Sequence, residues 1–160
     1  LMKLSMGGHH KTPRRLSFQE RFLFYGLCGI TAEVFFTGLW EAIENGEQRL
    51  VGVSSVYAFG VYAVAILVIE QLFFLIQDRI SLLWRGILYM FIAYTAEFSL
   101  GAILRMYEAC PWDYSTYFRY HFLGLVTAEY IPVWYLGSIF AERVVIDTAH
   151  RLAWLGLKHD

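Results

Sequence analysis

Residues 56–76 read VYAFGVYAVAILVIEQLFFLI, and Glu70 is the only charged side chain among them. A transmembrane α-helix needs about 20 consecutive, mainly apolar residues, because the hydrocarbon core of a bilayer is about 30 Å thick. Polar residues bound the run on both sides, with Ser54-Ser55 before it and Asp78-Arg79 after it. The stretch therefore predicts a membrane-spanning helix.

Three further apolar runs cover residues 22–40, 86–104 and 122–146. Buried helices of a soluble protein could imitate one such run, but not four joined by short polar segments. A helix also satisfies its backbone N–H and C=O groups internally, as a lipid environment requires. We therefore expect an all-α membrane protein, a four-span transmembrane helix bundle, with residues 22–146 as its membrane domain.

The composition agrees with this expectation. The chain is 58% hydrophobic and only 17% charged, whereas roughly a quarter of the residues in an average soluble domain are charged. The formal net charge of -1 argues against a strongly basic nucleic-acid binder. We expect membrane lipids as partners and no nucleic acid, and homo- or hetero-oligomers within the membrane stay open.

The positive charges lie unequally on the two sides that a four-span topology defines. The side that holds both termini and the loop after residue 76 carries 10 of the 13 Lys and Arg residues. They are Lys3, Lys11, Arg14, Arg15, Arg21, Arg79, Arg85, Arg143, Arg151 and Lys158. The other side carries Arg49, Arg105 and Arg119. By the positive-inside rule, this multi-pass protein should have both termini in the cytoplasm.

The two ends differ in pattern. Residues 1–21 form a basic segment without a long apolar run. In residues 147–160, apolar residues recur at helical spacing while Asp147, Arg151 and Lys158 lie off that face. This pattern predicts either a short amphipathic helix on the cytoplasmic surface or a frayed terminal tail.

Short matches within the chain indicate an internal duplication. The tripeptide that ends in Glu33 recurs as the one that ends in Glu97, both reading Thr-Ala-Glu. The interval from Gly52 to Glu70 also equals the interval from Gly124 to Glu142. A helical hairpin repeated in parallel would give a pseudo-two-fold axis along the membrane normal. Chance matching is the alternative, because membrane segments use a small alphabet.

Each predicted span carries an interior glutamate, namely Glu33, Glu70, Glu97 and Glu129. A charged side chain near the bilayer centre costs roughly 2.5 to 3.5 kcal/mol on insertion scales. These carboxyl groups should therefore face the bundle interior, where no Lys or Arg lies at matching depth. Glu41 and Glu142 lie near span ends, where we expect solvated interfacial charges.

Three interpretations of the interior glutamates compete. They could form a proton or cation path, or a metal site of the di-metal four-helix kind. They could also be protonated acids that hydrogen-bond across helices as structural contacts. The di-metal plan requires a His three residues after a Glu on two helices, and the spans have none. We therefore assign no metal ligand and no cofactor.

The loop after the third span contains the most distinctive local sequence, CPWDYS, made of Cys110, Pro111, Trp112, Asp113, Tyr114 and Ser115. Pro111 favours a turn and Asp113 can accept backbone N–H bonds. Trp112 and Tyr114 are typical interfacial anchors. We predict a structured outer loop, with Cys28 and Cys110 as free thiols.

A catalytic use of this region would require Glu129, Asp113 and His121 to converge on one pocket. The chain has no serine nucleophile elbow, HExxH, Walker A or GxGxxG motif. We therefore assign no catalytic residue.

Four segments resemble the transmembrane protein 229 family, nearest its B form. They are residues 33–41, the Gly52–Tyr57 run GVSSVY, the 109–115 run ACPWDYS and the 122–127 run FLGLVT. More remotely, Trp112-Asp113-Tyr114-Ser115 is similar to the CmpB-like group of bacterial membrane proteins, which are labelled type IV ABC-transporter components. Those proteins carry Gly-Arg-Ile after the motif, whereas this chain has Phe122-Leu123-Gly124-Leu125. The resemblance implies a small four-span protein with no established activity.

Our leading functional hypothesis is a membrane component of transport or lipid handling, whose interior carboxylates bind a proton, a cation or a polar headgroup. A membrane-embedded lipid-modifying enzyme and a non-catalytic scaffold are the alternatives. A polar track joining Glu33, Glu97 and Glu70 would favour transport, and a dry, fully paired interior would favour the scaffold.

The charge asymmetry makes a topology prediction. Single cysteines placed near Arg14 and near Asp160 should react with an impermeant thiol reagent only from the cytoplasmic side. A cysteine at Ser115 should react only from the opposite side. Reaction of all three from one side would reject the four-span topology.

Overall fold

The structure is a computed structural model that describes residues 13–154, which are mostly helical. Its three longest helices are α1 (Phe18–Asn45), α2 (Val56–Ile76) and α3 (Leu82–Met106). Each of these helices is long and apolar enough to cross a membrane. The expected membrane architecture is confirmed to this extent.

The fourth predicted span, residues 122–146, is wrong in its first third. The strands β2 (His121–Phe122) and β3 (Val126–Thr127) form an antiparallel hairpin there. Its turn contains Leu123 and Gly124, with φ angles of 52° and 67°. Two successive residues in the left-handed region cannot belong to a right-handed helix, so the helix begins only after this hairpin.

The rest of that segment is helical in several pieces. A 3-10 turn (Ala128–Tyr130) leads into α4 (Ile131–Phe140), a π-helical segment (Ala141–Ile146) and α5 (Asp147–Arg151). Pro132 lies in the first turn of α4, where its missing N–H costs no helical hydrogen bond. Among the elements of residues 13–154, only α1, α2 and α3 meet the length and apolarity expected of a span, so a fourth span is not shown.

Local sequence determines where α1 begins. The Ser17 hydroxyl accepts the Glu20 N–H at 3.4 Å, and the Glu20 carboxylate accepts the Ser17 N–H at 2.7 Å. This reciprocal capping box satisfies two of the backbone donors that a helix start leaves free. Gly46, with φ 67°, ends the helix in the left-handed conformation that glycine tolerates.

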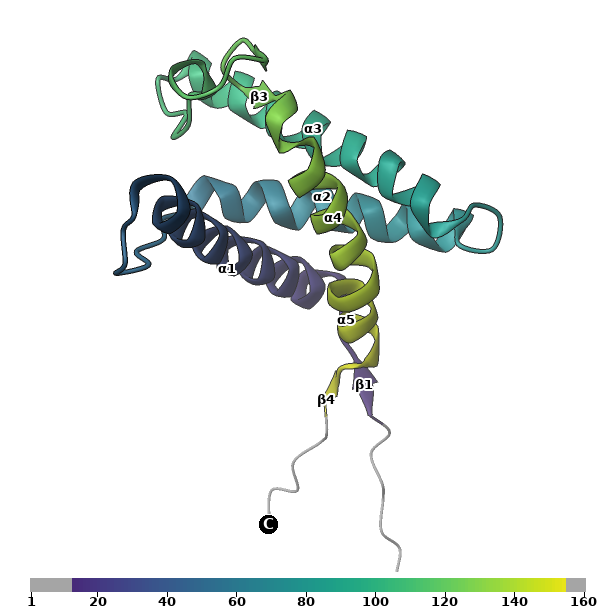
Figure 1. Cartoon of the computed structure of the whole chain (residues 1–160). Coiled ribbons are helices and arrows are strands. Elements are labelled where there is room, and N and C mark those ends of the chain that lie inside the picture. The colour runs from purple at the N-terminus through teal and green to yellow at the C-terminus, as the bar shows by residue number, and fades with distance from the viewer. Residues whose placement is uncertain (1–12, 155–160) are drawn as a thin grey trace, which may run out of the picture.

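Helices that are neighbours in the sequence pack against each other. Thus α1 contacts α2, α2 contacts α3, and α3 contacts α4. Figure 1 shows α4 and α5 crossing over α2 and ending beside the start of α1. There β1 (Arg14–Arg15) pairs antiparallel with β4 (Ala153–Trp154). The two ends of the described chain are therefore held together.

This pairing differs from the tail that the sequence predicted. The helix ends at Arg151, and residues 153–154 form a strand. Ile146 and Ala149, which share one face of this helical segment, are buried in the protein core. The same helical spacing can direct an apolar face toward lipid or toward another helix, and here α5 packs on its own bundle. Residues 155–160 of the predicted amphipathic segment lie outside the described residues.

Outside the core, many large apolar side chains are exposed on the long helices, among them Phe35, Leu75 and Phe91. Exposure of so many large apolar side chains is unusual for a monomer in water. These faces fit a lipid environment, as the composition requires.

Glu70 on α2 is fully buried and is held by three side chains from other elements. The Arg21 Nε atom lies 3.0 Å from Glu70 Oε1, and the Tyr25 hydroxyl donates to the same oxygen at 2.5 Å. His150 Nε2 from α5 lies 2.6 Å from it. The expectation that Glu70 has no basic partner at its depth is wrong, because Arg21 extends inward from the first turn of α1.

Glu142 has an equivalent environment in the π-helical segment. Its carboxylate accepts two hydrogen bonds from Arg85, from Nε at 2.8 Å and Nη2 at 2.6 Å, and one from Tyr89 at 2.7 Å. Arg85 also donates to the carbonyls of Gln77 and Ile80 after α2. Glu142 is 2% exposed, so its assignment as a solvated interfacial charge is wrong.

These two clusters match the intervals of the sequence repeat. The interval from Arg21 to Arg85 equals the one from Glu33 to Glu97, and the same holds from Tyr25 to Tyr89. In both halves an Arg and a Tyr one turn apart on the first helix bind the glutamate of the second. Independent contacts at matched positions favour duplication over chance.

Removing the Glu142 carboxylate should be strongly destabilising, because it leaves the buried Arg85 charge without its partner. We expect Glu142→Ala to lower the free energy of unfolding by about 3–5 kcal/mol. Glu44, which is exposed on α1, provides the control. The free energy of unfolding of Glu44→Ala should stay within about 0.5 kcal/mol of that of the parent. Unfolding of the detergent-solubilised protein measures both, and equal effects would contradict the buried ion pair.

Candidate functional site

A cavity of about 720 Å³ lies between α1, α2, α3, the start of α4 and the CPWDYS loop. Its volume is within the range of small-molecule sites. Four of its lining residues are acidic, namely Glu33, Glu41, Glu97 and Asp113. No Lys, Arg or His lines it among the described residues. Asp113 is paired with Arg105, whose Nη2 lies 3.9 Å from Asp113 Oδ2, so the acids that make the cavity acidic are Glu33, Glu41 and Glu97.

Glu97 is the most buried of these acids, with 6% of its surface exposed. Its Oε1 atom accepts a hydrogen bond from the Tyr114 hydroxyl at 2.7 Å. Its Oε2 atom is buried without a hydrogen-bond partner in the described part of the chain, and so is Nε1 of Trp134, which lines the same cavity. Buried polar atoms are nearly always paired. The Trp134 side chain lies close enough to act on the Glu97 carboxylate as a neutral donor, so what Oε2 lacks is a well-formed hydrogen bond and a charged partner.

Glu33 faces the same cavity from α1 and is half-buried. Its Oε2 atom accepts a hydrogen bond from the Ser54 hydroxyl at 3.0 Å. The expected interior orientation of Glu33 and Glu97 is thus observed. Tyr94, on the same helix as Glu97, donates its hydroxyl hydrogen to the Thr127 carbonyl at 2.7 Å.

Ser54 is held in place by the connection between α1 and α2. A Cβ atom on Gly52 would lie 1.7 Å from the Val34 carbonyl oxygen, so only glycine permits this approach. The Thr37 hydroxyl accepts the Val53 N–H at 2.8 Å and lies 2.9 Å from the Val53 carbonyl oxygen. The segment between α1 and α2 therefore packs along α1 beside Glu33.

The CPWDYS loop covers the cavity as a structured turn, as predicted. The Trp112 indole N–H donates to the Leu125 carbonyl at 3.0 Å, and Asp113 Oδ1 accepts the Ser115 N–H at 2.9 Å. These bonds from Ser115 hold the pKa of Asp113 below its ordinary value of 3.8. Tyr114 follows directly and extends to Glu97, which links the loop to the interior.

Aromatic rings form much of the cavity wall. Tyr130 lies edge-on to Phe36, Trp40, Tyr114 and Phe118, with ring centroids 4.9 to 5.9 Å apart. All five rings line the cavity. We call these five residues the aromatic wall. Nearer the interior, the Tyr62 and Trp134 rings lie 6.2 Å apart and line the same space.

The other two predicted interior glutamates lie elsewhere. Glu70 belongs to the ion cluster with Arg21, so no continuous track joins it to Glu33 and Glu97 among the cavity-lining residues. Glu129 accepts the backbone N–H groups of Arg119 and Tyr120, both at 3.0 Å. A hydrogen bond from the Thr127 hydroxyl holds the pKa of Glu129 below its ordinary value. Glu129 therefore stabilises the β2–β3 hairpin.

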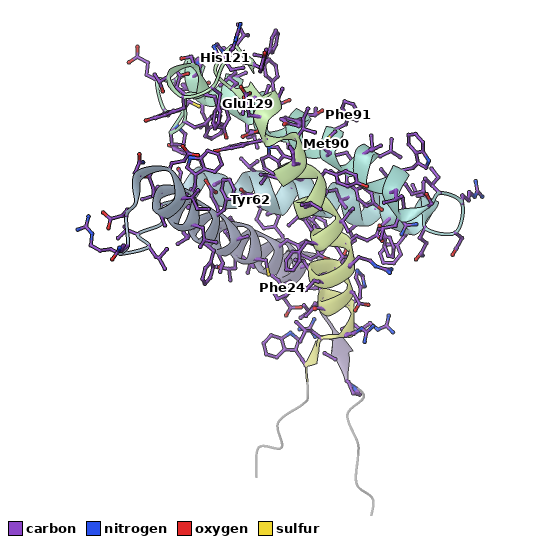
Figure 2. The ribbon with its side chains drawn as sticks, viewed as in Figure 1. Phe24, Tyr62, Met90, Phe91, His121 and Glu129 are labelled. Carbon is purple, nitrogen blue, oxygen red and sulfur yellow. The ribbon has the colours of Figure 1, made fainter. Side chains whose placement is uncertain are left out.

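The residues of the enzyme alternative do not converge. Asp113 lines the cavity, whereas Glu129 and His121 are absent from its lining residues. Figure 2 shows His121 and Glu129 in the outer loop region, apart from Tyr62. His121 accepts the Gly124 N–H through Nδ1 at 3.1 Å, which is a contact within the turn.

Sequence reasoning missed the aromatic wall and the partners of Glu97. One signal was present, because the interval from Tyr62 to Trp134 equals the interval from Glu70 to Glu142. It would have placed Tyr62 and Trp134 at equivalent positions, but not Tyr114, which reaches Glu97 from a loop with no counterpart in the first half.

No family model matches the chain, and no solved structure matches it.

Asp113 should contribute more to the outer loop than Cys110 does. Asp113→Ala removes the acceptor of the Ser115 N–H and should lower the thermal midpoint in detergent. Cys110→Ser should change it less, because the Cys110 thiol only donates to the Trp112 carbonyl at 3.3 Å. The folded pKa of Asp113 is lowered, so its contribution is present above pH 3.8 and is lost as the pH falls through the folded pKa. The difference between parent and Asp113→Ala should therefore close in acid. A larger effect of Cys110→Ser would indicate a functional thiol.

Proposed function

We propose that this protein is a membrane component of transport or lipid handling that binds a cation in the cavity between Glu33 and Glu97. The observation that carries the proposal is the partly unpaired Glu97 carboxylate, which faces an acidic cavity without a lining Lys, Arg or His among the described residues. The proposal includes a four-span topology with cytoplasmic termini, in which residues 131–151 supply the fourth span.

Electrostatics supports a cation as the occupant. Two carboxylates in one low-dielectric space repel each other, and both can be ionised only if positive charge enters with them. Elsewhere in the bundle the same problem is solved by Arg21 and Arg85, which neutralise Glu70 and Glu142. Around Glu33 and Glu97 no such internal cation is supplied, so an external cation or a proton takes that role.

A purely structural role for the two glutamates has less support. A scaffold needs a fully paired interior, whereas Glu97 Oε2 has no well-formed hydrogen bond in the described chain and no Lys, Arg or His lines the cavity that it faces among the described residues. The resemblance to the transmembrane protein 229 family implies a small polytopic membrane protein and indicates no ligand.

The test is stabilisation of the purified protein by cations. Chloride salts of Na⁺, K⁺, Ca²⁺ and tetramethylammonium should raise the thermal midpoint of the parent to different extents, and the best of them identifies the preferred cation. Glu33→Gln and Glu97→Gln keep shape and hydrogen bonding but remove the charge, so they should fold and lose this stabilisation. Glu44→Gln, on α1 but outside the cavity, should respond like the parent.

Comparison at equal salt concentration cancels the general effect of ionic strength. If the two Gln variants respond to every cation as the parent does, the cavity is not the cation site and the proposal fails. If neither the parent nor the variants respond to any cation or to pH, the scaffold alternative holds.

A further inference from the structure

Aromatic side chains dominate the walls around the two glutamates. Trp40 is near the centre of the aromatic wall, with its ring centroid 5.9 Å from those of Phe36 and Tyr130 and 6.0 Å from that of Phe118. An organic cation is attracted to the face of an aromatic ring within about 6 Å of its centroid, and the edge-to-face packing of these rings turns their planes in different directions. Simple inorganic ions gain less from such a wall, because they must lose tightly bound water.

The donor set also disfavours a metal ion. No group of three or more His, Cys, Asp and Glu side chains in the described residues is arranged to hold one. A hard cation such as Ca²⁺ requires six or more oxygen ligands. Glu97 offers one free carboxylate oxygen here, which can neutralise a diffuse charge but cannot complete a coordination shell.

We propose that the cavity recognises an alkylated ammonium group of the choline type, with Glu97 and Glu33 balancing its charge and the aromatic wall contacting its methyl groups. This inference rests on the proposed function and names its ligand class. The volume of about 720 Å³ accommodates a group of this size with an attached chain. The same ammonium chemistry occurs in free choline and in the headgroup of phosphatidylcholine.

Calorimetry on the full chain in a maltoside detergent tests the proposal. Choline is titrated beside 3,3-dimethylbutan-1-ol, which has the same shape but no charge. Choline should bind the parent and the neutral analogue should bind at least tenfold more weakly. Glu97→Gln should abolish the difference between the two.

Two tryptophan variants separate the aromatic contribution from general stability. Trp40→Leu removes a wall ring and should weaken choline binding about 3- to 30-fold. Trp84→Leu removes a tryptophan that is 66% exposed on α3 and lies outside the cavity lining, so choline affinity should not change. Tyr130→Leu provides a second wall variant if Trp40→Leu does not fold.

A competition arm identifies the source of the ammonium group. If dihexanoylphosphatidylcholine displaces choline and dihexanoylphosphatidylglycerol does not, the ammonium group comes from the lipid headgroup. Displacement by neither indicates the free cation, and both results support the ammonium site.

Other outcomes overturn the inference. If an inorganic cation stabilises the parent through Glu97 while neither choline nor the phosphatidylcholine binds, the proposed cation site stands and the ammonium ligand is wrong. If the neutral analogue binds as well as choline, the cavity is only an apolar pocket. If no cation binds in either experiment, the proposed function falls together with this inference.

Discussion

Buried arginine–glutamate pairing is the interaction on which the helix arrangement depends. A single charge in an apolar interior costs several kcal/mol, so each buried Glu must lie where an Arg can reach it. Glu142 meets this requirement through Arg85, which ties the π-helical segment to the start of α3. Glu70 meets it through Arg21 and also contacts His150, so α1, α2 and α5 meet at one carboxylate. These contacts specify which faces of the helices meet, something that apolar packing within a lipid-like environment defines poorly.

Polar groups in the bundle are divided into two zones with different electrostatics. In the first zone, the buried carboxylates of Glu70 and Glu142 each have a guanidinium partner and a tyrosine hydroxyl. Around the cavity, the matched pair Glu33 and Glu97 has only neutral donors, Ser54 and Tyr114. In the first zone, an arginine balances the charge of each carboxylate. The second has surplus negative potential, and that difference is why the cavity, and not the ion clusters, is the candidate site.

The outer loop connects the two features that distinguish this cavity. Trp112 packs on α3, where a Cβ atom on Gly101 would lie 2.8 Å from its ring. Tyr114 then brings one hydroxyl to Glu97 and one ring to the aromatic wall. Because Asp113 and Glu129 bind backbone N–H groups of the loop and hairpin, their charges stabilise the cover of the cavity. The CPWDYS motif is therefore an architectural element of this cavity.

The sequence by itself determined the apolar helices, their order, the structured CPWDYS turn and the presence of acids inside the bundle. Those features follow from local properties: hydrophobic run length, capping residues and the energetic penalty of an isolated charge in lipid. It also contained the repeat intervals that relate Glu70 to Glu142 and Arg21 to Arg85, although not which arginine binds which glutamate. Only the tertiary structure decided that Glu33 and Glu97 share a cavity, that Glu70 and Glu129 do not, and that residues 122–127 form a hairpin. The reason is physical: which carboxylate finds a cation depends on how far a long side chain reaches across a helix interface, and this distance is not encoded in any local pattern.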